Sequence, residues 1–391
     1  MSLSISRAIR MNYLCYALAF GCTYPFLAPY FQEVLRVSDA QLGLIMMIRP
    51  LMALVGQPFW SLIADGSGRR SHLAGVLLVI AAVVYPVMMF VQGTSVSLAL
   101  FAVWAFFNAP INTLSDSITL DYLKPQGRAR FASYRVFVSM GFLAAVAFIG
   151  IVYDKTDIRE QFGAYTCFVL LTLVFLWQIP SVPKTPFKAG ALALRRLLRK
   201  RNVLVFLCAV FLVETANGMA LTFLSVYCKQ LGATNVQVGW VWGMGTLSEI
   251  VTMFLFSRIY ARLGVKKILL IGVAAVVLKW FPFAHVAVWW QVLPLQLLHA
   301  FTLTFVYVGS VTFMDMESHH SIRVTAQAFY TMFILNTAYV VGSILGGQIS
   351  ETFGMRAIYH ASSLMACLAF GILLCFVHNP EAETDQRIDS M

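Results

Sequence analysis

Charged and titratable side chains lie inside long stretches of this sequence that are otherwise apolar. They are Arg49, Asp116, Arg135, Glu214, Glu249, Lys279 and His299, and the polar residue Asn217 stands close to Glu214. An ionisable group in such a stretch costs free energy unless it faces a cavity or a partner of opposite charge. These residues are therefore the candidates for binding a polar solute or for carrying protons.

Glu249 is the first candidate for carrying a proton. It lies about half way along its apolar stretch, with Ser248 and Thr252 as polar neighbours. A carboxyl group in an apolar environment can hold a proton at physiological pH. The alternative is a protonated glutamic acid that only makes a hydrogen bond where two helices meet.

Lys279 and His299 lie on two consecutive apolar stretches, across a hairpin. Histidine can change its charge near neutral pH, which makes His299 a second candidate for proton transfer. Lys279 could bind an anionic group or hydroxyl groups of a solute. The alternatives are that Lys279 extends its long side chain towards the membrane surface and that His299 only packs in the protein interior.

Asp116 and Arg135 are expected to face each other near the cytoplasmic ends of two consecutive stretches. Such a pair could bind substrate or form a gate, and the alternative is a static buried ion pair. Arg49, beside a proline, could be another cavity charge or could pair with an acid such as Glu214. Glu214 and Asn217 form a polar cluster of the kind that lines pathways through membrane proteins.

Composition identifies the elements that carry these residues as membrane-spanning helices. Of the 391 residues, 60% are hydrophobic and only 12% are charged, and the mean hydropathy is +0.78. A soluble protein of this size would need a more polar surface. Spans of about 20 residues each predict an all-α membrane protein with twelve transmembrane helices. We expect six-helix halves at residues 1–180 and 203–378, a cytoplasmic basic linker with a short surface helix at 181–202, and a cytoplasmic tail at 379–391.

The net charge of +11 is explained by its distribution along the chain and not by a nucleic-acid partner. When the spans are assigned as above, 20 of the 28 Lys and Arg residues fall on one side of the membrane. This asymmetry follows the positive-inside rule and predicts a multi-pass protein of the cytoplasmic (inner) membrane with both termini in the cytoplasm. The basic linker is better explained as an orientation signal than as a ligand site.

The two halves repeat each other at an offset of 196 residues. The matched pairs include Ser38 with Thr234, Gln41 with Gln237, Gly68 with Gly264, Asp121 with Glu317, Tyr134 with Tyr330 and Gly150 with Gly346. A repeat of apolar spans at half the chain length is typical of two-half transporters. We expect Ser38 to cap the second span and Asp121 and Glu317 to make loop contacts. The aromatic residues, including Trp280, Trp289 and Trp290, are expected to form mostly an aromatic belt near the outer surface, and the alternative is that some of them stack on a planar substrate.

A motif closes the stretch Gln41–Arg70, which we expect to be one long helix followed by a short loop. Its end, SLIADGSGRR, resembles the cytoplasmic loop motif of the major facilitator superfamily, Gly-x-Leu-Ala-Asp-Arg-x-Gly-Arg-Arg. The resemblance implies a cytoplasmic gate made by Asp65, Gly68, Arg69 and Arg70. The strings GTLSEI, QLLHAFT and RVFVSMGF, with Lys279-Trp280, resemble the phenylpropionate permease group, which is similar to lactose permease and the nucleoside–proton symporters.

The sequence therefore favours a secondary active transporter that takes up a small polar or anionic organic solute together with protons, by alternating access. Arg135 and Lys279 would bind the solute, and Glu249 and His299 would take part in protonation. A proton-driven exporter of amphipathic compounds is the alternative. A membrane sensor or scaffold on a degenerate transporter fold is disfavoured, because nothing would then maintain the costly charges inside the spans. A membrane enzyme is disfavoured because no nucleophile–base pair can be identified.

The sequence contains no Gly-x4-Gly-Lys-Ser/Thr loop for binding phosphates and no metal-ligand spacing. We therefore expect no cofactor, with the proton gradient as the source of energy. The expected partners are a small-molecule substrate, protons and the lipid bilayer, with no nucleic acid, and we expect the protein to be a monomer.

Overall fold

The computed structural model describes residues 4–91, 93–123, 131–180, 191–319 and 322–379. These residues form helices joined by short connections, and no strand occurs among them. Residues 124–130, the linker residues 181–190 and the tail from residue 380 lie outside the described residues. The short helix expected in the linker is α9 (Ala191–Leu198).

Contacts between residues divide the chain into two compact units. Unit 1 contains Met1–Phe187 and Ser225–Gly243, and unit 2 contains Lys188–Leu224 and Met244–Met391. A part of the predicted second half thus groups with unit 1. The division into two halves at the linker stays a prediction.

The helices that begin in unit 1 are α1 (Ile5–Glu33), α2 (Asp39–Met46), α3 (Ile48–Ser67), α4 (Arg70–Val87), α5 (Thr94–Asn108), α6 (Ile111–Leu123), α7 (Phe131–Lys155), α8 (Glu160–Leu176) and α11 (Asn235–Phe283), which continues into unit 2. The others are α9, α10 (Arg201–Gln230), α12 (Val292–Gln296), α13 (Gly309–Glu317), α14 (Arg323–Phe329), α15 (Leu335–Phe353) and α16 (Met355–Phe376). Two π-helical segments, η4 (Phe301–Val308) and η5 (Tyr330–Ile334), precede α13 and α15.

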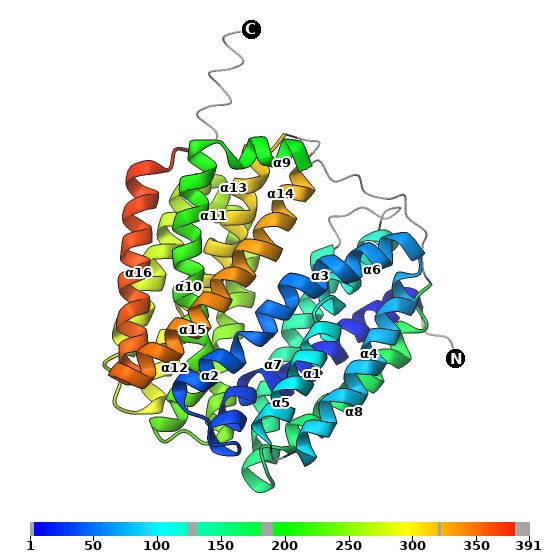
Figure 1. Ribbon diagram of the computed structural model, residues 1–391. Helices are drawn as coiled ribbons and strands as arrows, with labels where there is room; N and C mark the ends of the chain where they lie inside the picture. The colour runs from blue at the N-terminus through cyan, green and yellow to red at the C-terminus, as the bar shows by residue number, and fades with distance from the viewer. Residues whose placement is uncertain (1–3, 92, 124–130, 181–190, 320–321, 380–391) are drawn as a thin grey trace. The chain divides into compact units, whose positions relative to one another are not determined.

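Helix α1 is the central helix of unit 1. It packs along α7 and α8, while α4 packs against α5 and α8 (Figure 1). Glycine brings α1 and α7 close together, since a Cβ added to Gly141 would lie 2.5 Å from the Leu14 carbonyl oxygen. Small residues at such crossings let membrane helices gain packing contacts that lipid cannot provide. Most of α1 is therefore buried.

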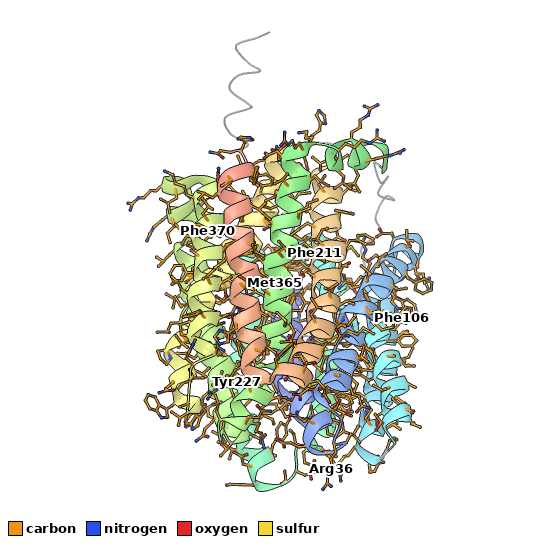
Figure 2. All side chains as sticks on the ribbon, turned by 60° about the vertical axis from the view of Figure 1, so that its left-hand side comes forward. Arg36, Phe106, Phe211, Tyr227, Met365 and Phe370 are labelled. Carbon is orange, nitrogen blue, oxygen red and sulfur yellow. The ribbon has the colours of Figure 1, made fainter. Side chains whose placement is uncertain are left out.

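Helix α10 has the corresponding buried position in unit 2. It runs beside α16 in Figures 1 and 2, where Met365 and Phe370 mark α16, and the Ser362 hydroxyl donates to the Ala216 carbonyl oxygen at 3.0 Å. Helix α15 packs against α16 and comes close to α10 at Gly342.

The predicted cap of the second span is confirmed, and it recurs in the second copy of the repeat. Ser38 Oγ accepts a hydrogen bond from the Gln41 N–H, and the Gln41 side chain accepts one from the Ser38 N–H. Thr234 and Gln237 make the same reciprocal pair at the start of α11. These capping boxes satisfy amide groups that would otherwise be unpaired at each helix start.

The loop glycines of the repeat both have a positive φ, although their ψ angles differ (6° at Gly68 and 170° at Gly264). Gly68 has φ 64° and ends α3, and Gly264 has φ 71° and interrupts α11. Glycine adopts a positive φ without the steric cost that a side chain would add. The chain after the second span of each copy thus has a glycine where φ is positive.

Ten helices of the described part are long and apolar enough to cross a membrane. Two more apolar segments are α8, which is shorter, and the part of α11 after Gly264. The fold is therefore the predicted all-α membrane fold, and its helices are consistent with the twelve spans expected from the sequence.

The long helix expected from Gln41 onward is present as one candidate span, Asp39–Ser67. Its hydrogen bonding is interrupted at Met47, which lies between α2 and α3 and keeps helical dihedral angles. Pro50 explains the break, because it has no N–H to donate to the Met46 carbonyl, where α2 ends. Proline is tolerated in the first turn of a helix, which is its position in α3. Arg49 lies directly at this break.

Candidate functional site

An accessible ion pair joins α6 and α7 of unit 1. The Arg135 guanidinium donates to both carboxylate oxygens of Asp116, and the Tyr13 hydroxyl donates to Asp116 Oδ1 at 2.7 Å. The side chains of Arg135 and Asp116 are 42% and 29% exposed, so the pair is not buried as the static alternative required. The structure brings together the two residues that the sequence expected to face each other, and their role stays a prediction.

Sequence reasoning missed the polar side chains that surround this pair. Besides Tyr13, Asn12 on α1 donates to the Ser115 hydroxyl at 3.4 Å. Further along α1, the Tyr16 hydroxyl donates to Asn108 Oδ1 at 3.1 Å. The available signal was that Asn12 and Tyr16 are four residues apart, which puts them on the same helix face.

Arg49 on α3 lies against aromatic rings. Its guanidinium carbon is 4.6 Å from the Phe20 ring centroid and 4.7 Å from that of Tyr24, both on α1. All three side chains are half-buried. The alternative pairing of Arg49 with Glu214 would join the two units and stays a prediction.

A second polar cluster lies inside unit 2. Lys279 Nζ on α11 is 3.2 Å from His299 Nδ1 and 4.3 Å from the Trp280 ring centroid. Thr302, in the π-helix η4, lies 3.4 Å from the same nitrogen of His299. Lys279 is 0% exposed, so it does not extend to the membrane surface as its alternative proposed. Single π-helical turns inside α-helices are frequent at functional sites.

Trp280 is also buried, so its assignment to an aromatic belt was wrong. Its indole N–H donates to Asn217 Oδ1 on α10 at 3.1 Å. Glu214 and Asn217 are both buried on α10. A buried indole N–H requires an acceptor, and Asn217 provides it. Trp280 follows Lys279 directly on α11. The contact between Trp280 and Asn217 is therefore adjacent to the Lys279–His299 pair.

Glu249 is half-buried on α11. One turn before it, a Cβ added to Gly245 would lie 3.1 Å from the His299 ring, so α11 packs against His299 at that point. Residues four apart share a helix face, and Ser248 donates to the Gln296 carbonyl oxygen at 3.3 Å. Glu249 is therefore one helical turn from the contact of α11 with His299.

Arg70, at the end of the stretch Gln41–Arg70, forms ion pairs with two carboxylates. Its guanidinium donates to Asp65 and, at 2.9 Å, to Asp121 Oδ2. The side chains of Arg70 and Asp121 are 8% and 4% exposed, whereas that of Asp65 is 37% exposed. Asp121 thus contacts the last residue of the motif loop, as expected, and this contact is buried. Arg69 is exposed at the start of α4.

In the second copy of the repeat, the acid that matches Asp121 has partners from a different part of the chain. Glu317, which matches Asp121, has a side chain that is 2% exposed. It accepts hydrogen bonds from Lys200 Nζ at 3.1 Å and from the Asn202 amide at 2.7 Å. Lys200 lies in the bend between α9 and α10, so Glu317 makes the loop contact that was expected. A carboxylate buried to this degree needs a cation or several donors.

Among the described residues, no group of three or more His, Cys, Asp and Glu side chains could hold a metal ion. The expectation that the protein needs no cofactor stays a prediction.

Membrane-spanning helices, an internal repeat and polar clusters inside the spans together define a class of protein, the two-half membrane transporters. The family model described as "MFS_1 like family" matches residues 7–361. The chain therefore belongs to this family, within the major facilitator superfamily.

The chain is similar to several curated transporters over nearly its whole length. It is 25% identical to a maltose permease of Geobacillus stearothermophilus, covering 93% of this chain and 91% of the relative. It is 21% identical to the "Probable 3-phenylpropionic acid transporter" of Escherichia coli (94% and 96%) and 22% identical to the multidrug resistance protein MdtG of Dickeya zeae (87% and 86%).

Among solved structures, the chain resembles a point mutant of the nucleoside transporter NupG, with a TM-score of 0.86 and 14% identity. The match covers 95% of this chain and 100% of NupG. It confirms the major facilitator fold. The chain is therefore an integral multi-pass membrane transporter of this superfamily, and not an enzyme.

Proposed function

We propose that the protein is a proton-coupled symporter that takes up a small polar or anionic organic solute by alternating access. The observation that carries this proposal is the contact of 3.2 Å between Nζ of the buried Lys279 and Nδ1 of the half-buried His299. A hydrogen bond between two nitrogen atoms needs a lone pair on one of them. In this arrangement, therefore, Lys279 and His299 do not both carry their full number of protons.

This contact offers a way to link solute binding to proton binding. A solute hydroxyl or carboxylate that draws Lys279 away from His299 leaves the imidazole nitrogen free to accept a proton. Solute and proton then bind together, and their joint release on the other side completes the cycle. In this proposal Glu249, one helical turn from the α11 contact with His299, passes the proton on.

The Asp116–Arg135 pair supplies the second set of solute contacts in this proposal. Arg135 offers a planar set of N–H donors, which suits a carboxylate or paired hydroxyl groups. Asp116 can accept hydrogen bonds from solute hydroxyls. Because both side chains are partly exposed, a solute can reach them and replace the contact between Asp116 and Arg135 by contacts of its own.

The remaining features of the proposal follow from the sequence. The distribution of Lys and Arg supports an inner-membrane protein with both termini in the cytoplasm. The protein acts as a monomer and uses the proton gradient without a cofactor. The Asp65–Arg70 contact belongs to a cytoplasmic gate.

The second candidate function is proton-driven export of amphipathic compounds, favoured by the similarity to MdtG. Symport and export differ in the direction of solute movement relative to protons. A symporter accumulates solute in liposomes whose exterior is more acidic, whereas an antiporter depletes it from them.

The experiment begins with purified protein and a panel of sugars, nucleosides, aromatic acids and peptides, screened by thermal stabilisation. The best ligand is then offered, radiolabelled, to proteoliposomes with an acidic exterior. We expect accumulation that collapses when a protonophore is added, and a loss of accumulation in His299→Gln. His285→Gln changes an exposed histidine outside the cluster and serves as the control. Accumulation unaffected by the protonophore would contradict the proposal.

A further inference from the structure

Two exposed histidines of unit 2 lie side by side, outside the cluster of Lys279 and His299. His285 lies just after the end of α11, and His360 lies in the second turn of α16. Their ring centroids are 5.0 Å apart, and the ring planes are nearly perpendicular, at 87°. Both side chains are exposed, whereas Lys279 is 0% exposed. The two histidines therefore form a separate pair, and both belong to unit 2.

The separation of the two rings suits two ligands of one metal ion. Histidine binds Zn²⁺ through a ring nitrogen at about 2.0–2.1 Å, and the ligands of the ion are arranged tetrahedrally. Two imidazoles bound to one such ion have ring centroids roughly 5 Å apart. The 5.0 Å between the rings of His285 and His360 matches this separation, so α11 and α16 need not move to form the site.

A hydrogen bond to the main chain leaves one nitrogen of His285 available as a metal ligand. His285 Nδ1 lies 3.0 Å from the Phe281 carbonyl oxygen. A carbonyl oxygen can only accept a hydrogen bond, so Nδ1 carries the proton and Nε2 of the neutral imidazole keeps its lone pair. Histidines that bind metals commonly donate their other ring N–H to a carbonyl or carboxylate oxygen in this way, which fixes the ring. His285 thus already has the form that a metal ion requires.

The surroundings of the pair suit an ion that keeps some of its water. The Phe281 ring lies against both imidazoles, with its centroid 5.0 Å from that of His285 and 6.1 Å from that of His360. A surface hollow adjoins His285 and is lined by Phe281, Pro282, His285, Val286 and Gln291. Water in this hollow can occupy the ligand positions that two histidines leave open.

We propose that His285 and His360 form a binding site for one divalent transition-metal ion, Zn²⁺ or Cu²⁺, with water as the remaining ligands. Imidazole suits these ions, whereas Mg²⁺ and Ca²⁺ prefer oxygen ligands. The site joins α11 to α16, which also meet where the Phe283 and Tyr359 rings lie 5.3 Å apart. A bound ion therefore stabilises the packing of these two helices.

This inference goes beyond the proposed transport function and does not depend on it. The two histidines are far apart in the sequence, which is why the spacing of residues did not reveal the site. With both termini in the cytoplasm, as predicted, the start of α16 lies at the outer surface, so the ion reaches the site from outside.

The first test uses the wild-type protein, purified without a histidine tag and freed of metal ions with EDTA. The coupling of Cu²⁺ to nitrogen nuclei in electron paramagnetic resonance spectra counts the imidazoles bound to the ion. We expect one tightly bound Cu²⁺ with two imidazole ligands, and an unfolding temperature that Zn²⁺ raises and Mg²⁺ does not. Cu²⁺ bound by a single imidazole, or equal temperature shifts with Mg²⁺ and Zn²⁺, would overturn the inference.

The second test assigns the ion to these two residues by calorimetric titration with Zn²⁺. His285→Gln and His360→Gln should each weaken binding at least about tenfold, because losing a residue that only orients a ligand already costs about 10–100-fold in metal affinity. Each variant should leave one imidazole on Cu²⁺. His72→Gln removes an exposed histidine on α4 and should bind both ions as wild type does. Wild-type Zn²⁺ affinity in either His285→Gln or His360→Gln, or an equal loss in His72→Gln, would refute the site.

Discussion

Neutralising Asp121 should destabilise the protein far more than neutralising Asp65, although both accept hydrogen bonds from Arg70. The side chains of Arg70 and Asp121 are 8% and 4% exposed, so their contact is screened little by solvent. The Asp65 side chain is 37% exposed. Substituting Asp121 by Asn keeps the size of the side chain and removes only its charge.

The magnitude follows from burial. Removing one partner of a buried ion pair leaves a charge without compensation and costs about 3 kcal/mol or more. Asp65 remains beside Arg70 in Asp121→Asn, which holds the cost near the lower end of that range. For Asp65→Asn, solvent screening reduces the cost to about 1 kcal/mol or less. Asp121→Asn should therefore show the larger fall in unfolding temperature.

Thermal unfolding of the purified variants in one detergent measures this difference by tryptophan fluorescence. Glu317→Gln is the matched comparison in the second copy of the repeat, since its side chain is 2% exposed and contacts Lys200. It should resemble Asp121→Asn. Equal unfolding temperatures for Asp65→Asn and Asp121→Asn would refute the reasoning from burial.

Three further predictions concern transport. Arg135→Lys keeps the charge and loses the planar donors, so ligand binding should weaken about tenfold; wild-type affinity would leave only a gating role. Glu249→Gln should abolish accumulation against a gradient while exchange continues, and pH-dependent accumulation by this variant would exclude Glu249 as the coupling acid. Asp65→Asn should slow transport, increase cysteine labelling of cavity positions from the cytoplasmic side and leave ligand affinity unchanged. Adding Ala261→Asp, at the position that matches Asp65 in the second copy of the repeat, should not restore the rate. Normal transport and labelling would show that Asp65 is only a loop residue.

Local features of the fold could be predicted because their causes are local in sequence. Ser38 and Gln41 form a capping box, and Thr234 and Gln237 repeat it, because each pair has the required spacing. The apolar spans follow from hydropathy alone. The break at Met47 was missed because apolar residues continue through it, although Pro50 was a signal for it.

The candidate site could be predicted only in part, because contacts between helices depend on how each helix is rotated. The Asp116–Arg135 pair could be predicted because the two residues carry opposite charges on consecutive spans. Hydropathy could not show that Lys279 is fully buried beside His299, since a long side chain there can also reach the membrane surface. The rings beside Arg49 were not predicted, because aromatic residues are common throughout the spans.

The central claim is that solute and protons move together through the cluster of Lys279 and His299. Its most direct test is the external pH of a weakly buffered suspension of proteoliposomes when ligand is added without any imposed gradient. We predict alkalinisation outside the liposomes that scales with solute uptake, persists in His285→Gln and disappears in His299→Gln. Solute uptake without a pH change, or an unchanged signal in His299→Gln, would contradict the account.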